Sequence, residues 1–312
     1  MSFQPITTVY SYYLPEVRRL VSDLTREFPH EVFLRSVDPG LDDFHLPVLD
    51  KLVRFHEREV TGLRDFPWRY PTAGSEEGIR EYFTALAVAG GGPVYAWKGD
   101  YEGYREVAKS RGLTLRDVET GTDPASLPPG HWFVSNPSAR DGMTVPADAI
   151  RAIADAGHRV FYDLSYLGTT PPAAYDLTHP NVDAVALSFS KPYGLFYYRI
   201  GFLFSRREIP VLYANKWFKN VFGLLVAERV LDTFDQPALA AKYKALQARV
   251  VAGINAGTGL GLLPSDVFLL ARLDAAGAAR LDDEQRRRVS RFARGDGYRF
   301  CLTPCFQDAE VP

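Results

Sequence analysis

Residues 186–201 read ALSFSKPYGLFYYRIG, and this stretch decides how the rest of the chain is interpreted. It continues the apolar run Val182–Leu187, which is typical of a buried strand. Ser188, Lys191 and Arg199 follow, and a lysine in such a place is usually exposed to water. The serine and the arginine can, however, fix an anionic group beside the amine of Lys191. A desolvated amine has a lowered pKa and can form a Schiff base with an aldehyde cofactor.

Length and composition are those of a globular protein. The 312 residues allow one large domain, or one large and one small domain. Hydrophobic residues make up 46% and charged residues 24%, which is ordinary for a soluble protein. The net charge of −2 gives no electrostatic reason to expect binding to nucleic acid or to an anionic membrane. No apolar run approaches the roughly 20 residues that span a bilayer, so we expect no membrane segment.

The cysteines and the first residues indicate a reducing compartment. Cys301 and Cys305 are the two cysteines, and no histidine cluster or second cysteine pair accompanies them. We therefore expect neither a metal site nor a disulfide framework. Residues 1–5 form neither the basic nor the apolar region of a secretion signal, so we expect a cytoplasmic protein.

Helix and strand patterns follow one another through the first 165 residues. Apolar spacing predicts helices over Leu14–Phe28 and Leu46–Val60, the second ended by Gly62. Asp38-Pro39-Gly40 is a turn between them. The further predictions, in chain order, are a helix over Arg80–Ala89, a strand over Pro93–Trp97, a helix over Arg105–Ser110, a strand over His131–Ser135, a helix over Val145–Ala156 and a strand over His158–Tyr162.

The pattern changes after Leu203. A single helical stretch is predicted over about Gly223–Ala252, and Pro237 can kink or split it. Behind it the sequence predicts a strand over Pro264–Leu273, a helix over Asp282–Ala293 and a strand over Tyr298–Leu302.

Gly74-Ser75 stands at the start of the helix that continues to Ala89. As a bare motif it is an ordinary N-cap. The alternative is an anion site, because free N–H groups at a helix N-terminus, with the dipole behind them, favour a phosphate. In that case the side chain of Glu76 has to point away, since like charges repel.

Three further polar groups follow predicted strands. Tyr101 and Tyr104 are surface or core aromatics unless one of them stacks on a ring. Asn136-Pro137 alone marks a turn. Asp163 is either a helix cap or turn residue, or a buried carboxylate. A buried carboxylate that faces the ring nitrogen of a bound pyridine keeps that nitrogen protonated, so that the pyridine ring accepts electrons. Strand ends are where an open α/β sheet builds its site.

In this order the motifs resemble those of class I/II aminotransferases, the pyridoxal-phosphate (PLP) enzymes of fold type I. Ser188-x-x-Lys191 with Arg199 is similar to the family's cofactor-lysine segment, and residues 74–79 are similar to its phosphate cup. An aromatic residue, Asn-Pro and Asp-x-x-Tyr lie between them at compatible spacing. The resemblance covers roughly residues 45–302 and implies an α/β fold with a mostly parallel central sheet flanked by helices.

The resemblance implies a role for each residue. Lys191 forms the Schiff base and then moves the substrate α-proton, while Asp163 maintains the electron sink. Arg299 aligns with the arginine that binds the substrate α-carboxylate as a bidentate fork. By its short motif alone Arg299 is equally a surface strand residue, with Arg35 or Arg69 as alternative clamps. The other implied contacts are Gly74, Ser75, Glu76, Ser188 and Arg199 at the phosphate, Tyr101 stacked on the ring, Tyr166 at the ring oxygen, and Asn136 at the ring oxygen and the substrate.

Some family features are missing. Asp100 stands where a proline usually precedes the aromatic residue, and the loop 136–142 lacks a second proline and a threonine. The tyrosine that reaches the neighbouring subunit's phosphate has no clear match. The resemblance still implies a homodimer with three parts. These are an N-terminal arm with part of the small domain (1–45), a PLP-binding domain (46–222), and a linking helix with a trimmed small C-terminal α+β domain (223–312).

The implied reaction is PLP chemistry at the α-carbon of an amino acid. Aminotransfer from an amino acid to a keto acid is the commonest outcome in the family, and lyase, decarboxylase and cyclase reactions are the alternatives. A non-catalytic protein of this fold would be expected to lack Lys191, Asp163 or the phosphate cup. A dinucleotide-dependent oxidoreductase is rejected because Gly90-Gly91-Gly92 precedes a strand and does not follow one.

Overall fold

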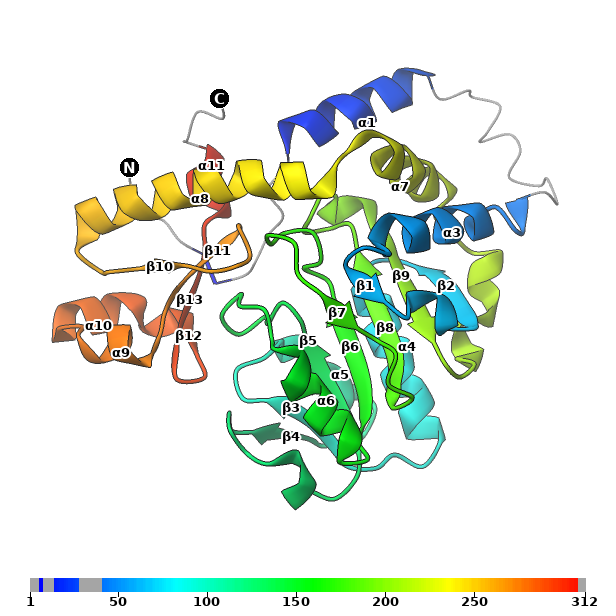
Figure 1. Ribbon diagram of the computed structural model, residues 1–312, viewed down its shortest axis with the longest axis horizontal. Helices are drawn as coiled ribbons and strands as arrows, with labels where there is room; N and C mark the ends of the chain where they lie inside the picture. The colour runs from blue at the N-terminus through cyan, green and yellow to red at the C-terminus, as the bar shows by residue number, and fades with distance from the viewer. Residues whose placement is uncertain (1–5, 8–13, 28–40, 308–312) are drawn as a thin grey trace.

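A seven-stranded sheet forms the centre of the larger part of the molecule (Figure 1). The computed structural model describes residues 6–7, 14–27 and 41–307. The strand order is β2-β9-β8-β6-β5-β3-β4, and β9 runs antiparallel to the other six. The strands are β2 (Trp68–Thr72), β3 (Val94–Trp97), β4 (Leu115–Val118), β5 (His131–Ser135), β6 (Arg159–Leu164), β8 (Val182–Ser188) and β9 (Gly201–Ser205).

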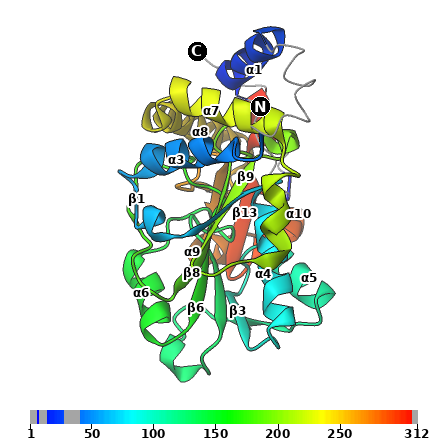
Figure 2. The same ribbon diagram turned by 90° about the vertical axis from the view of Figure 1, so that its right-hand side faces the viewer.

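Helices cover both faces of this sheet (Figure 2). Alternate side chains of one strand point to opposite faces. In β5, Phe133 packs toward α4 (Ser75–Val88) and α5 (Glu102–Ser110), whereas Trp132 packs toward α6 (Ala147–Asp155). Because both faces are buried, the central strands read as continuous apolar runs, and this is why they are recognisable in the sequence.

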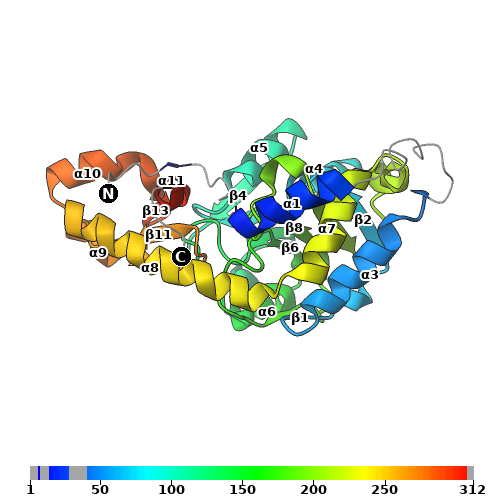
Figure 3. The same ribbon diagram turned by 90° about the horizontal axis from the view of Figure 1, so that it is seen from above.

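A four-stranded antiparallel sheet forms the smaller part, in the order β10-β11-β13-β12. The long helix α8 (Gln236–Thr258) leads into it from the larger part (Figure 3). The elements of this part are β10 (Leu263–Pro264), β11 (Leu270–Leu273), α9 (Ala275–Ala279), α10 (Asp283–Val289), η7 (Ser290–Phe292), β12 (Ala293–Arg294), β13 (Gly297–Cys301) and α11 (Thr303–Gln307).

The stretch predicted as a helix over Gly223–Ala252 contains two separate helices. The prediction of one continuous helix was therefore wrong, and the alternative that Pro237 splits it is confirmed. The first is α7 (Val221–Thr233), and α8 begins at Gln236 with Pro237 in its first turn. Proline lacks an N–H donor and is tolerated in the first turn, where no intrahelical bond is lost.

The N-terminal helix α1 (Pro15–Glu27) packs on α7, as does α3 (His45–His56). Glu16 accepts hydrogen bonds from the side chains of Lys242 and Tyr243, which fasten α1 to the start of α8. The predicted helix over Leu14–Phe28 is confirmed up to Glu27, and Phe28 and the turn at 38–40 lie outside the described residues.

Two predicted elements end differently in the structure. The helix predicted to reach Val60 ends at His56, because Val60–Thr61 forms strand β1 beside β7 (Tyr175–Asp176). The strand predicted over Pro264–Leu273 is interrupted at 265–269. There the N–H groups of Val267 and Phe268 donate to Gly142 and Thr169 of the larger part, and not to a neighbouring strand.

The helix predicted over Asp282–Ala293 ends at Val289 and continues as the turn η7. The helix predicted over Arg80–Ala89 is α4, which begins at Ser75, directly after the Gly74 expected at its start. The remaining predicted helices and strands are confirmed to within three residues at each end. The remaining short turns are η3 (Leu63–Asp65), η4 (Pro124–Ser126), η5 (Phe196–Tyr198) and η6 (Pro210–Lys216). Within the described residues, no helix combines the length and the apolar character that crossing a bilayer requires.

Candidate active site

A cavity of about 250 Å³ opens where the carboxyl ends of β3, β5, β6 and β8 meet the β12–β13 hairpin. Its wall brings together residues from widely separated parts of the sequence. Ten of the sequence-predicted site residues line it: Gly74, Ser75, Glu76, Tyr101, Asp163, Tyr166, Ser188, Lys191, Arg199 and Arg299.

One end of the cavity is the N-terminus of α4. Gly74 precedes this helix with φ +80° and supplies no side-chain cap. The Arg199 side chain crosses over Gly74, where an added Cβ would lie 2.7 Å from its Nη2. Arg199 donates to the carbonyls of Ala73 (2.6 Å) and Phe196 (3.3 Å). A helix N-terminus and a guanidinium group therefore converge, which is an arrangement suited to an anion.

Gly201 makes this convergence possible. A Cβ on Gly201 would lie 2.3 Å from the backbone of Gly74, so only glycine lets β9 approach the start of α4 so closely. Gly201 is also the register partner of Ser188, which places that hydroxyl at the same end of the cavity. The Ser188 Oγ accepts a hydrogen bond of 3.1 Å from the backbone N–H of Ser190.

The Glu76 carboxylate points away from the start of α4, as an anion site at that place requires. It pairs with Arg80 one turn further along α4, at 3.2 Å. The negative charge is therefore compensated by a cation on the body of the helix, away from the N–H groups of its first residues.

Asp163, at the end of β6, is a buried carboxylate. It accepts hydrogen bonds from the Tyr104 hydroxyl (2.8 Å), the Ser165 N–H (2.9 Å) and the Ser165 hydroxyl. Burial raises the pKa of Asp163, and the bonds from Ser165 and Tyr104 oppose that rise. The Ser165 hydroxyl also lies 2.7 Å from the Ser75 hydroxyl, so it links the carboxylate to the start of α4.

The structure separates the two candidate aromatic residues. Tyr101 lines the cavity and is 37% exposed. Tyr104 is fully buried behind it, with its hydroxyl on Asp163 and its ring edge-on to that of Tyr101 at 5.2 Å. Of the two, Tyr101 is the ring that a ligand can reach.

Lys191 lies in the cavity with its Nζ 5.3 Å from the centre of the Phe196 ring. Burial lowers the pKa of Lys191 to about 8, with help from the positive charges of Arg299 and Arg199 and against the effect of Cys301. An amine with such a pKa is partly neutral near pH 7, which is the form that attacks carbonyl groups.

Asp100 is a cavity residue to which the sequence analysis assigned no role. It is buried, lines the cavity, and accepts hydrogen bonds from the Ser135 hydroxyl and the Tyr101 N–H. Burial raises the pKa of Asp100 to about 6, with a smaller contribution from the charge of Asp163. Its position directly before Tyr101, at a strand end, was the signal that could have indicated it.

Arg299 is 7% exposed. Its Nη1 donates to the carbonyl of Ala139 and its Nη2 to that of Thr7 (3.0 Å). Its Nε is buried and has no hydrogen-bond partner among the described residues. The guanidinium group is thus held in place by two carbonyls and keeps donors for a ligand in the cavity.

Asn136 does not line the cavity. Its Nδ2 donates to the Tyr162 hydroxyl (2.6 Å) and to the carbonyl of Val145 (3.1 Å), and its Oδ1 accepts from the Val145 N–H. Both amide hydrogens are engaged behind the cavity wall, so the amide shapes the loop that follows β5.

Arg69 and Arg35 were the alternative arginines for binding the substrate carboxylate, and neither lines the cavity among the residues that the structure describes. Arg69 bonds to Phe66, Asp50 and Arg64 at the outer edge of the sheet. Arg35 lies outside the described residues.

A family model described as "Aminotransferase class I and II" matches residues 71–281, which is more than half of the chain. No curated protein matches the chain in sequence.

Several solved structures are similar in fold. Histidinol-phosphate aminotransferase from Sinorhizobium meliloti, in complex with pyridoxal-5'-phosphate, is 21% identical with a TM-score of 0.68 over 95% of this chain and 85% of that one. N-Succinyldiaminopimelate aminotransferase from Mycobacterium tuberculosis is 17% identical, with a TM-score of 0.67 over 97% and 88%. L-threonine-O-3-phosphate decarboxylase from Porphyromonas gingivalis is 15% identical, with a TM-score of 0.64 over 97% and 98%.

Proposed function

The chain belongs to the class I and II aminotransferase family of PLP-dependent enzymes, and we propose that it transfers an amino group from an α-amino acid to a keto acid at the cavity around Lys191. One observation carries this proposal. A lysine with a lowered pKa shares the cavity with a buried carboxylate and with the N-terminus of α4.

The residues of the cavity fit PLP. The space that a side chain on Gly74 would fill is occupied by the guanidinium group of Arg199, so backbone N–H groups and a cation are available to a phosphate. The phosphate end would be held by Gly74, Ser75, Ser188 and Arg199. Tyr101 would cover the ring face, Asp163 would hold the ring nitrogen, and Tyr166 would contact the ring oxygen.

When bound, PLP supplies an aldehyde that bonds to amines and a ring that accepts electron density from the α-carbon. Lys191 supplies the amine to which it attaches, and later a base for the α-proton. A pKa of about 8 suits both tasks, because the amine loses and regains a proton close to neutral pH.

Asp163 holds negative charge in a place that excludes water. Its three hydrogen bonds orient the carboxylate, and Ser165 fixes it relative to the start of α4. A buried carboxylate stabilises a proton on a nitrogen that faces it. We therefore assign to Asp163 the task of keeping the ring end of the site positively charged during the reaction.

Arg299 orients the substrate. The carbonyls of Ala139 and Thr7 fix its guanidinium plane, and the free Nε–H with a neighbouring Nη2–H can make two parallel hydrogen bonds to an α-carboxylate. Because its other donors are fixed, the fork is preorganised and little conformational freedom is lost on binding.

Two further parts of the proposal concern assembly and compartment. We propose a homodimer, because aromatic side chains on η5 and directly after η6 are exposed, with Tyr197 and Phe218 each more than 80% accessible. We also propose a cytoplasmic location, since Cys301 and Cys305 are the two cysteines of the sequence and neither forms a disulfide.

A donor and acceptor screen tests the reaction. The protein loaded with PLP is given one amino acid and one keto acid at a time, and both products are quantified. Transamination predicts one new amino acid formed for each donor consumed. Release of ammonia or carbon dioxide without a new amino acid would contradict it and would indicate a lyase or decarboxylase.

A further inference from the structure

Arg294 is a third arginine in the wall of the cavity, beside Arg199 and Arg299, and the roles above leave it without a function. It lies on β12 and pairs with Gly297 of β13, and Arg299 stands two residues beyond Gly297. Paired residues of an antiparallel sheet share a face, as do residues two apart on one strand. The two arginines therefore leave the same face of the hairpin, from positions about 7–8 Å apart.

The tip of this hairpin is seated on the larger part of the molecule. A Cβ on Gly99 would lie 2.4 Å from the backbone nitrogen of Gly295, so the two backbones are in direct contact. Both glycines have positive φ, which a residue with a side chain adopts only with strain. This contact fixes the position of Arg294 relative to the loop that carries Tyr101.

The charge of Arg294 is only weakly compensated. Its Nη2 lies 3.2 Å from Glu102, whose side chain is 70% exposed, whereas that of Arg294 is 21% exposed. An ion pair with so exposed a partner adds little. Burial lowers the pKa of Arg294, and the nearby charge of Arg299 lowers it further, so an anion between the two would relieve this repulsion.

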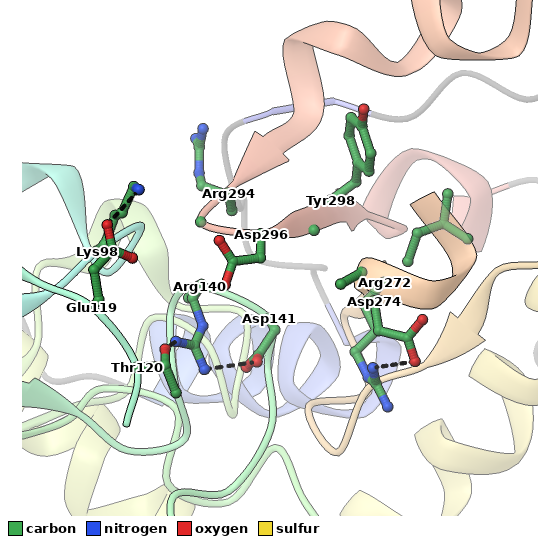
Figure 4. Close-up of a pocket in the computed structure, with 14 residues that line it drawn as sticks. Lys98, Glu119, Thr120, Arg140, Asp141, Arg272, Asp274, Arg294, Asp296 and Tyr298 are labelled. Atoms are coloured by element: carbon green, nitrogen blue, oxygen red, sulfur yellow. Dashed lines mark hydrogen bonds and ion pairs between the residues drawn. The ribbon is translucent and has the colours of Figure 1, made fainter. Parts of the chain in front are cut away.

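Arg294 also borders a neighbouring pocket of about 180 Å³, but that pocket is not suited to an anion. Figure 4 shows Arg294 directed away from Arg140 and Asp141 of that pocket. Its other cations each have an acidic neighbour, so it offers no net charge to an anion. The pairs are Lys98 with Glu119 (2.6 Å), Arg140 with Asp141 (3.2 Å) and Arg272 with Asp274 (3.6 Å).

Resting on the proposed function, we infer that the substrate carries a second anionic group on its side chain, a carboxylate or a phosphate, and that Arg294 selects it. Arg299 is the more buried of the two and takes the α-carboxylate. Arg294 is more exposed, so it meets the distal end of the same molecule. Glu102 holds Arg294 in place before the substrate arrives and is exchanged for the anionic group.

Matched amino acids test this inference on the PLP-loaded enzyme. L-glutamate is compared with L-glutamine, and O-phospho-L-serine with L-serine, by the rate at which each changes the cofactor absorbance. The wild type should prefer the charged member of at least one pair, and which pair shows the preference identifies the carboxylate or the phosphate. In Arg294→Gln the preference should fall about 10- to 100-fold, the range for a lost hydrogen bond to a charged group.

Arg140→Gln is the control, because Arg140 is also an arginine beside the hairpin but does not line this cavity. It should keep the wild-type preference. Calorimetric binding of glutarate adds a readout that needs no turnover, and Arg294→Gln should weaken it by a similar factor.

An unchanged preference in Arg294→Gln, or no preference in the wild type, would overturn this inference while the proposed function stands. No reaction of PLP-loaded protein with any of the four amino acids would also overturn this inference, whereas the proposed function is decided separately by the donor and acceptor screen.

Discussion

At the scale of single residues, burial controls the protonation of the groups around Lys191. It lowers the pKa of Lys191 to about 8 and raises that of Asp100 to about 6. It also raises the pKa of Asp163, whose hydrogen bonds work in the opposite direction. Several shifted groups in one cavity are typical of a site that moves protons.

Asp163→Asn should lower kcat at least about a hundredfold, the loss usual for a removed electrostatic contact in an active site. The amide keeps the shape but cannot stabilise a neighbouring positive charge. Asp100→Asn is the matched control, since it alters a second buried carboxylate of the same wall, and it should cost far less. Steady-state kinetics of both variants check this, and equal losses would show that Asp163 has no special role.

The sequence could indicate most of the site because its residues stand at strand ends in a characteristic order. Ser165 and Asp100 were missed because their importance depends on partners distant in the chain, Ser75 and Ser135. Asn136 was expected in the cavity, but no local pattern could show that the Val145 backbone and the Tyr162 hydroxyl engage its amide.

At the scale of elements, the parallel interior strands β3, β5, β6 and β8 were predicted from their apolar runs. The antiparallel interior strand β9 is equally buried but was not predicted, and neither were the edge strands. β2 and β4 are the two edges of the large sheet, and neither was predicted. Both carry polar or exposed residues, since one side of an edge strand has no neighbour. The sequence could not decide whether Pro237 kinks one long helix or begins a new one, because proline permits both. The structure has two helices, α7 and α8.

Helix α3 gives a prediction on pH and stability. His56 is buried in it, and burial lowers the pKa of this histidine to about 3. Below the ordinary histidine pKa of about 6.5, the unfolded chain binds a proton that the folded chain does not, so stability falls with falling pH. This one group should cost about 1.4 kcal/mol for each pH unit below about 6.

His56→Leu should remove that dependence. Denaturant unfolding at several pH values between 5 and 7 measures the free energy of unfolding of both proteins. The difference between wild type and variant should shift in favour of the variant as the pH falls. A difference that is constant with pH would show that His56 does not contribute.

At the scale of the whole molecule, the cavity lies where the large sheet meets the small one. Its wall combines strand ends of the larger part with the β12–β13 hairpin of the smaller part. We propose that the chain divides functionally as the sequence suggested, near residue 45 and near residue 222. The larger part would then hold the cofactor, and the hairpin would bring the substrate-binding arginines.

The exposed aromatic residues predict a mass in solution of twice 34.9 kDa. Light scattering coupled to size exclusion measures it. Phe218→Glu combined with Tyr197→Glu should shift the protein toward the monomer, because charges in an apolar interface are costly to bury. Val88→Glu, at a similarly exposed apolar residue on α4, should leave the mass unchanged. An active wild-type monomer would refute the dimer.

Borohydride trapping shows whether PLP attaches to Lys191. The protein is incubated with PLP, reduced with sodium borohydride, digested and analysed by mass spectrometry. The phosphopyridoxyl mass is predicted on the peptide that contains Lys191, and Lys191→Ala should lose both this label and turnover. A label on another lysine, such as Lys98 or Lys219, or full activity in Lys191→Ala, would show that Lys191 is not the residue to which PLP attaches.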